Sequence, residues 1–301
     1  MKAVWSFWTK PFRSRGKWAW SSRKHHLLSW VLSVERARLH YPFTSLHTDD
    51  EGARTLVEGI GLDFDHVSTG LNALEDADPG WWALGKILTY ALQKEPFVHI
   101  DSDVFLWKPL PEMMLLADVL AQNPEHFSHG AFFYRPEVLE TAIHGVPGGW
   151  LPEEWEWYRS GGAPQQAECC GVFGGNRIDF INHYARQALK LLDHPANQAG
   201  LRIVGDKSEH MILIEQYFLA ACIQYHQQRK DSPYQGLTVA YLFNSMDEAF
   251  RPDNASRLGY THLIADAKRK PHITEKLERR VKTDYPAQYE RCLRYMGQHI
   301  D

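Results

Sequence analysis

Two aspartates separated by one residue follow an apolar segment about a third of the way along the chain. Residues 97–100 read Phe-Val-His-Ile, and Asp101, Ser102 and Asp103 come directly after them. Because alternate side chains of an extended chain point the same way, the two carboxylates can project together from the end of a strand. Hard divalent cations prefer carboxylate oxygens and keep positions open for a substrate phosphate. This spacing predicts a cation site suited to a diphosphate.

A single carboxylate interrupts the apolar face of a helix expected at residues 208–228. The apolar residues of this helix recur with a period near 3.6: Met211, Ile214, Phe218, Cys222 and Tyr225. Glu215 falls inside this stripe, and burying an acid is costly unless it is paired, hydrogen-bonded or protonated. Glu215 is therefore either a structural acid with a partner or an active-site residue. Glu209, His210 and Gln216 lie on other faces, where a solvated role is expected.

A histidine and a basic cluster lie close together near the end of the chain. His262 is followed by Lys268, Arg269 and Lys270. Imidazole can complete a cation site, and ammonium groups pair with phosphate oxygens. A lone histidine is more often an ordinary surface or core residue, and a Lys-Arg-Lys run is usually a solvated face. The residue types alone leave both possibilities open.

The segments before Asp101 alternate between short apolar runs and longer helical patterns, which is typical of a parallel sheet with crossover helices. We expect strands at residues 3–8, 43–47, 63–67 and 97–100, and helices at residues 18–39, 50–59 and 81–92. The aspartate pair would then lie at the carboxyl end of about the fourth strand. Ligands of open α/β sheets bind beyond such strand ends.

The middle of the chain is expected to be less regular. Residues 123–166 are rich in Gly, Pro and Trp and predict loops with short strands. Their aromatic residues could stack on sugar rings or bases, or form a small core beneath a long connection. Residues 171–176 predict a strand and tight turn, and residues 178–192 predict a helix.

The composition is that of an ordinary globular protein. The chain has 301 residues, of which 44% are apolar and 13% aromatic, enough for one large α/β domain. A formal charge of -4 gives no general attraction for nucleic acid. The four cysteines fit neither a disulfide framework nor a zinc site. Because no run approaches the roughly 20 apolar residues of a membrane helix and the first apolar run is too short for a signal peptide, we expect a cytoplasmic protein without a transmembrane segment.

Taken together, these features resemble a nucleotide-sugar-dependent glycosyltransferase of the GT-A type. The likeness rests on Asp-x-Asp after an apolar strand, Gly-Val-Phe-Gly-Gly-Asn at residues 171–176, Glu-Gln-Tyr-Phe at residues 215–218, and a late His followed by Lys-x-Lys-Pro. It covers nearly the whole chain and implies a Rossmann-like, mostly parallel sheet flanked by helices, with a small mixed acceptor-side subregion. It also implies one domain over residues 1–301, with a nucleotide-binding half at about 1–110. Residues from about 111 to 301 would form the acceptor-side half and a C-terminal segment that closes the metal and phosphate site.

The resemblance implies a role for each candidate residue. Asp103 and His262 would bind Mn or Mg, and Asp101 would contact the metal or the ribose. Lys268 and Lys270 would contact the diphosphate. The other residues implied to lie at the donor are Trp5, Ser6, Phe7, His47, Lys86 and Ser102. Lys86 faces away from the apolar stripe of its helix, so an exposed surface position is the alternative for it.

The implied reaction moves a sugar from a nucleoside diphosphate sugar, most simply a UDP-sugar, to a hydroxyl of a carbohydrate, lipid-linked or peptide acceptor. Glu215, Glu209 or Glu168 would stabilise the developing oxocarbenium ion or deprotonate the acceptor. Inversion and retention both stay open. Two departures from the family pattern are Glu-Cys-Cys-Gly-Val from Glu168 onward, instead of Asn-Ala-Gly-Val, and the missing glycine between His262 and the lysines.

Other classes share parts of the pattern. A haloacid-dehalogenase-type phosphotransferase would use Asp101 as its nucleophile, but its motif normally lies on the first strand. A non-catalytic carbohydrate-binding protein would use some of the 11 Trp and 13 Tyr, but it leaves the aspartate pair unexplained. A dinucleotide enzyme is disfavoured because no Gly-x-Gly-x-x-Gly follows the first strand.

Overall fold

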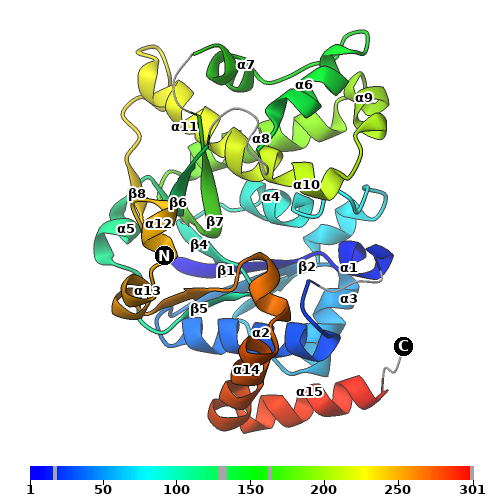
Figure 1. Cartoon of the computed structure of the whole chain (residues 1–301), viewed down its shortest axis with the longest axis vertical. Helices are drawn as coiled ribbons and strands as arrows, with labels where there is room; N and C mark the ends of the chain where they lie inside the picture. Colours follow the sequence, from blue (N-terminus) through cyan, green and yellow to red (C-terminus); the bar gives the residue numbers. More distant parts are fainter. Residues whose placement is uncertain (16–18, 128–133, 162–164, 299–301) are drawn as a thin grey trace. The chain divides into compact units, whose positions relative to one another are not determined.

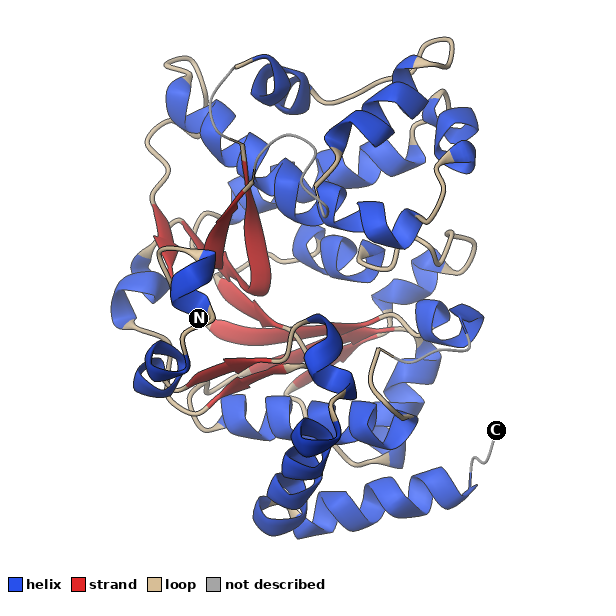
Figure 2. Cartoon of the chain, viewed as in Figure 1, coloured by secondary structure: helices blue, strands red, loops and turns tan. Residues whose placement is uncertain are grey.

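The computed structural model describes residues 1–15, 19–127, 134–161 and 165–298. Within these residues the fold is mixed α/β, and seven strands form a mostly parallel, Rossmann-like sheet flanked by helices (Figure 2). The α/β class expected from alternating apolar and helical segments is therefore confirmed. None of the described helices is long and apolar enough to cross a membrane.

The chain divides by its internal contacts into two compact units. The first unit consists of Met1–Asp76, Val98–Leu110 and Pro252–Asp301, and the second unit consists of Ala77–Phe97 and Pro111–Arg251. Each unit joins segments that are far apart in the sequence, so the units do not coincide with halves at about 1–110 and 111–301. The nucleotide and acceptor roles given to those halves stay predictions.

The first unit carries the amino-terminal part of the sheet. Its elements are β1 (Lys2–Phe7), α1 (Lys10–Arg15), α2 (Arg23–Arg38), β2 (Thr44–Thr48), α3 (Asp50–Ala53), the π-helical turn η1 (Arg54–Gly59), β3 (His66–Ser68), the 3-10 turn η2 (Gly70–Leu74), most of β4 (Phe97–Ile100), β5 (Val104–Leu106), α13 (Pro252–Leu258), β9 (Tyr260–His262), the 3-10 turn η4 (Ala265–Arg269), α14 (Pro271–Asp284) and α15 (Pro286–Gln298). The strand order is β3-β2-β1-β4, and β2 pairs in parallel with both β1 and β3. Helices α14 and α15 lie against α2 (Figure 1).

The strands expected at residues 3–8 and 43–47 are confirmed with shifted boundaries, whereas the strand expected at residues 63–67 is present only from His66 onward, and the helix expected at residues 50–59 is π-helical after Ala53. Helix α2 begins at Arg23, after Ser22, whose side chain accepts a hydrogen bond from the backbone N–H of His25 and so caps the helix. The expected start of this helix at Trp18 lies outside the described residues. All four residues of β4 are buried, as a strand inside a sheet requires.

A two-stranded antiparallel ladder of β5 and β9 extends the first unit beyond the end of β4. Val104 lies opposite His262, Phe105 opposite Thr261 and Leu106 opposite Tyr260. The pairing joins segments that are far apart in the sequence. It places the residue that follows Asp103 directly across from His262.

The second unit contains a smaller group of strands and most of the remaining helices. Its elements are α4 (Leu84–Ala91), α5 (Glu112–Leu116), β6 (Val119–His126), α6 (Pro136–His144), α7 (Glu153–Ser160), β7 (Gln166–Gly175), α8 (Ile178–Asp193), α9 (Asn197–Ile203), α10 (Lys207–Ile212), the π-helical turn η3 (Leu213–Tyr217), α11 (Phe218–Gln228), β8 (Val239–Tyr241) and α12 (Met246–Ala249). The strand order is β7-β6-β8, antiparallel between β6 and β7 and parallel between β6 and β8.

The prediction of loops and short strands across residues 123–166 was wrong. This segment contains the end of β6, helix α6 and helix α7. Its Pro and Gly residues mark helix ends instead: Pro136 and Gly145 bound α6, and Pro152 and Gly161 bound α7. Trp155 is fully buried, which supports the core alternative for at least this aromatic residue. Residues 128–133 and 162–164 lie outside the described residues.

The helix expected at residues 208–228 is present but irregular. Helices α10 and α11 are continuous through the π-helical turn η3, in which the N–H of Phe218 donates to the carbonyl of Leu213. Such wide turns insert one extra residue into a helix and occur often at functional positions. Glu215 lies in this turn, and its side chain is completely buried.

Candidate metal centre

Asp101, Asp103 and His262 converge in the first unit, where each offers a ligand atom within 4.8 Å of the other two. Strand β4 ends directly before the aspartates, and the pairing of β5 with β9 sets His262 opposite Val104. The Asp103 carbonyl accepts a hydrogen bond of 3.0 Å from the Leu263 N–H, which fixes the same approach. The structure therefore brings together the three residues that the sequence suggested as metal ligands, and their binding of a metal stays a prediction.

Asp103 is the buried member of the three and lies between two basic groups. The His262 Nε2 atom is 3.5 Å from Asp103 Oδ1, and the Lys268 ammonium group forms an ion pair with Oδ2. A buried carboxylate is costly without a compensating charge. Lys268 is therefore the counter-ion of this carboxylate, and a bound cation would have to take its place.

Asp101 is positioned through its backbone and flanked by a histidine. The Trp5 Nε1–H donates to Ser33 Oγ at 3.0 Å, and the Ser33 hydroxyl donates to the Asp101 carbonyl at 3.1 Å. These bonds join β1, α2 and the end of β4. The Asp101 Oδ1 atom lies 3.6 Å from His99 Nδ1, while His99 Nε2 is 2.9 Å from Ser6 Oγ. Ser6, expected at the donor, therefore supports the histidine behind Asp101.

The segment that carries Lys268 has an unusual backbone. Ala265, the first residue of η4, has φ of 49° and is the single non-glycine residue with positive φ in the described part of the chain. This conformation costs an L-residue about 1–2 kcal/mol relative to glycine. It occurs where the sequence lacks the expected glycine, so alanine occupies a glycine-type conformation between His262 and Lys268.

His26 on α2 interacts electrostatically with Lys268 and Asp103 of this centre. The sequence does not indicate this role for His26. Burial, together with the positive charge of Lys268, lowers the pKa of His26 to about 3. Its Nε2 atom accepts a hydrogen bond of 3.2 Å from Trp30 Nε1–H. His26 is therefore neutral at physiological pH and adds no second positive charge beside Asp103.

The aromatic residues expected at the donor are core residues. Trp5 is fully buried and meets Phe64 edge to face. Phe7 is also buried, and its ring centroid lies 5.2 Å from that of Trp30. Their side chains leave almost no exposed surface, so any contact with a nucleotide would involve the backbone of β1.

The remaining candidates of the first unit lie in different environments. His47 on β2 is buried near His66, and burial lowers its pKa to about 4. Ser102 is half-buried between the two aspartates, whereas Lys270 is exposed directly before α14. Lys268 therefore contacts the metal-ligand cluster, and Lys270 does not share its ion pair.

Glu215 has the partner that its place in an apolar stripe predicted. In the second unit, Lys86 Nζ lies 2.5 Å from Glu215 Oε1 and 3.4 Å from the Cys170 carbonyl oxygen. The Lys86 side chain is only 11% exposed. The alternative of an exposed Lys86 was wrong, because the buried carboxylate draws the ammonium group inward.

Glu168 and Glu209 differ sharply in environment. Gln166 Nε2 and the Tyr241 hydroxyl donate to Glu168 Oε1 at 2.8 and 3.0 Å. Burial nevertheless raises the pKa of Glu168 to about 8. Glu209 is 61% exposed and lies 3.4 Å from Arg135, as expected for a surface acid. The expectation of solvation was wrong for His210, which is buried.

The fold and this geometry define a mixed α/β protein with a carboxylate–histidine cluster at the carboxyl end of a sheet strand. The chain belongs to a protein family of unknown function, DUF6734, which matches residues 1–295. Comparison with curated proteins gave no match.

Proposed function

We propose that the protein is a metal-dependent glycosyltransferase that moves a sugar from a nucleoside diphosphate sugar to a hydroxyl acceptor. The observation that carries the proposal is the convergence of Asp101, Asp103 and His262 within 4.8 Å at the end of β4. Two carboxylates and one imidazole form a ligand set that suits Mn, or Mg with retained waters. The carboxyl ends of strands are also where open α/β sheets bind their ligands.

The chemistry of the proposal is stabilisation of the leaving group. Cleavage of the bond between sugar and phosphate leaves a nucleoside diphosphate with additional negative charge. When bound, a divalent cation supplies Lewis-acid stabilisation of that charge. Lys268 already contacts Asp103, and its ammonium group would neutralise diphosphate oxygens beside the same carboxylate.

The carboxylate of the reaction is assigned to Glu215 or Glu168 in preference to Glu209. Glu209 is exposed, so its interaction with a developing charge would be weakened by solvent. Glu215 has Lys86 as a counter-ion, whereas Glu168 has a pKa of about 8 and can hold or release a proton near neutral pH. A UDP-sugar as donor, a carbohydrate, lipid-linked or peptide acceptor, and a cytoplasmic location belong to the same proposal.

The two main alternatives have less support. A dehalogenase-type phosphotransferase would need Asp101 after the first strand, whereas it follows β4. A carbohydrate-binding protein would need exposed aromatic platforms, yet many of the tryptophans are buried: Trp5, Trp8, Trp20, Trp30, Trp81 and Trp155.

A thermal-shift panel tests the proposal. UDP, GDP and their common sugar conjugates are added to the full chain with and without Mn, because a ligand bound only by the folded state raises the melting temperature. We expect a metal-dependent shift for at least one nucleotide, which Asp103→Asn abolishes. The matched control is Asp266→Asn, which removes an exposed acid of the neighbouring turn η4 and should leave the shift intact.

The outcomes separate the alternatives. Absence of a metal-dependent shift with every nucleotide would overturn the donor site. Release of phosphate from p-nitrophenyl phosphate, lost in Asp101→Asn, would favour the phosphotransferase. Hydrolysis of one nucleotide sugar, followed by mass spectrometry, would identify the donor.

A further inference from the structure

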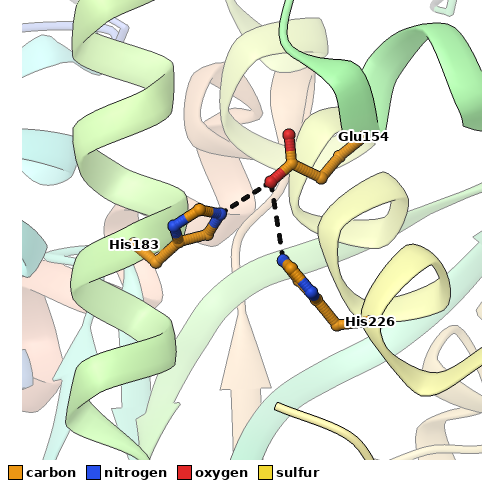
Figure 3. Close-up of side chains that lie close together, drawn as sticks. All are labelled: Glu154, His183 and His226. Atoms are coloured by element: carbon orange, nitrogen blue, oxygen red, sulfur yellow. Dashed lines mark hydrogen bonds and ion pairs between the residues drawn. The ribbon is translucent and has the colours of Figure 1, made fainter. Parts of the chain in front are cut away.

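A second cluster of metal-ligating side chains lies in the second unit. Glu154 on α7, His183 on α8 and His226 on α11 point toward one another (Figure 3). The Glu154 Oε1 atom is 2.6 Å from His183 Nε2 and 3.5 Å from His226 Nε2. Nothing in the proposed transferase site uses these residues.

The cluster is enclosed but accessible from one side. Glu154 and His226 are buried, whereas the His183 side chain is 26% exposed. Helix α11 packs against both α7 and α8, so each helix contributes one ligand to the same point. Rigid helices hold ligands more accurately than loops do.

The residue types suit a metal ligand set. Glu154 offers a carboxylate oxygen, and His183 and His226 each offer an imidazole nitrogen, within 4.8 Å of one another. A carboxylate beside two imidazole nitrogens is the donor chemistry that zinc and related ions prefer.

A hydrogen bond to the ring nitrogen that faces away from Glu154 fixes the orientation of His226. Its Nδ1 atom lies 2.8 Å from Ser232 Oγ, which also accepts the Tyr234 N–H at 3.0 Å. The His226 Nε2 atom is buried and faces Glu154 Oε1 at 3.5 Å. Hydrogen bonding of the far ring nitrogen to a second residue is the usual support of a metal-binding histidine.

We propose that Glu154, His183 and His226 bind a transition-metal ion of the zinc type, through one carboxylate oxygen and two Nε2 atoms. Such a set supplies three ligands of a tetrahedral site and leaves the fourth position to water or a ligand. With metal–ligand distances of roughly 2 Å, the ligand atoms must lie roughly 3.3 Å apart. The 3.5 Å separation of His226 and Glu154 already satisfies this.

The pair of Glu154 and His183 must change on binding. At 2.6 Å these atoms are joined by a hydrogen bond, and metal binding removes its proton from Nε2, to solvent if the ring is protonated or to Nδ1 if it is neutral, as the two atoms separate to roughly 3.3 Å. We expect His183 to be the residue that moves, because its side chain is 26% exposed. The ion would then join α7, α8 and α11 and stabilise the second unit.

The experiment titrates cobalt into the full chain after dialysis against a chelator. Co²⁺ replaces zinc and reports tetrahedral coordination through its visible absorption, which added Zn²⁺ should abolish. We expect His183→Ala and His226→Gln to weaken the absorbing site at least tenfold. His144→Ala removes an exposed histidine of the same unit and should have no effect.

Two further variants keep the test decisive. Ser232→Ala retains all three ligands and should weaken binding roughly tenfold, so it reports on the site if a ligand variant fails to fold. Asp103→Asn alters the first-unit cluster and should leave the cobalt signal unchanged. The proposal is overturned if the wild-type chain shows no zinc-sensitive tetrahedral signal, or if Asp103→Asn alone removes it.

Discussion

Lys268 forms an ion pair with Asp103, the same carboxylate that His262 approaches to 3.5 Å. The lysine therefore occupies the position of a counter-ion in a cluster that could otherwise hold a metal. A cation bound to Asp103 would compete with Lys268, and the ammonium group would become available to a phosphate. Loss of Lys268 should therefore strengthen the binding of a metal and weaken the binding of a nucleotide.

Replacement of Lys268 separates the two roles. In Lys268→Met, Mn should bind several-fold more tightly because its competitor is gone, whereas UDP in the presence of Mn should bind about tenfold more weakly because a charge-assisted contact is lost. Isothermal titration measures both affinities. Lys270→Met, which removes an exposed lysine nearby, is the control. Weaker binding of both ligands in Lys268→Met would contradict the competition.

The buried pair of Lys86 and Glu215 should be sensitive to loss of one member. Lys86→Met leaves a buried carboxylate without its counter-ion, and we expect the free energy of unfolding to fall by about 3–5 kcal/mol. Urea denaturation measures the change. Lys94→Met, at an exposed position, should stay within about 0.5 kcal/mol of the wild type. The double variant Lys86→Met with Glu215→Leu should recover much of the loss, and failure to recover would argue against an energetic pairing.

Ala265 should be improved by glycine. Relief of the positive φ gains about 1–2 kcal/mol, and the greater freedom of glycine in the unfolded chain costs about 0.4–1 kcal/mol. We therefore expect Ala265→Gly to raise the free energy of unfolding by roughly 0.5–1 kcal/mol. Ala267→Gly, in the same turn but without positive φ, should lower it. Equal effects at the two positions would show that Ala265 is unstrained.

Glu168 should make stability depend on pH. Its pKa in the folded chain is about 8, above its ordinary value of 4.5, so the folded state binds more protons than the unfolded state between these values. The stability that Glu168 contributes is fully present below pH 4.5 and falls as pH rises toward 8, by about 1.4 kcal/mol per pH unit. Urea unfolding at pH 5, 6 and 7 measures this slope. Glu168→Gln should flatten it, and an unchanged slope would exclude Glu168 as the source.

The sequence was sufficient for the strand that carries the aspartates. Residues 97–100 form β4 as expected, because a short apolar run between a helix stop and two acids has few other solutions. The place of His262 depends instead on the pairing of β5 with β9, which local pattern cannot indicate. Its residue type made His262 a possible ligand, and only the family resemblance grouped it with the two aspartates.

Side-chain contacts between helices that are far apart in the chain could not be predicted from the sequence. Lys86 and Glu215 are each candidates from the sequence, but their contact depends on how α4 meets the helix that contains η3. Glu154 gave no signal because it lies in a segment interpreted as loops, where Pro and Gly in fact mark helix ends. His183 and His226 have no ligand spacing in the chain, since each comes from a different helix.

Because the first unit is assembled from three separate segments of the chain, its candidate metal centre can form only late in synthesis. Asp103 leaves the ribosome about 160 residues before His262, a delay of ~10–30 s at 5–20 residues per second. Every segment of the second unit is translated in that interval or before it. Until β9 arrives, β5 is an open strand edge of the nascent chain, exposed to pairing with other polypeptides. Strand β9 thus covers that edge as well as bringing His262 to the carboxylate–histidine cluster.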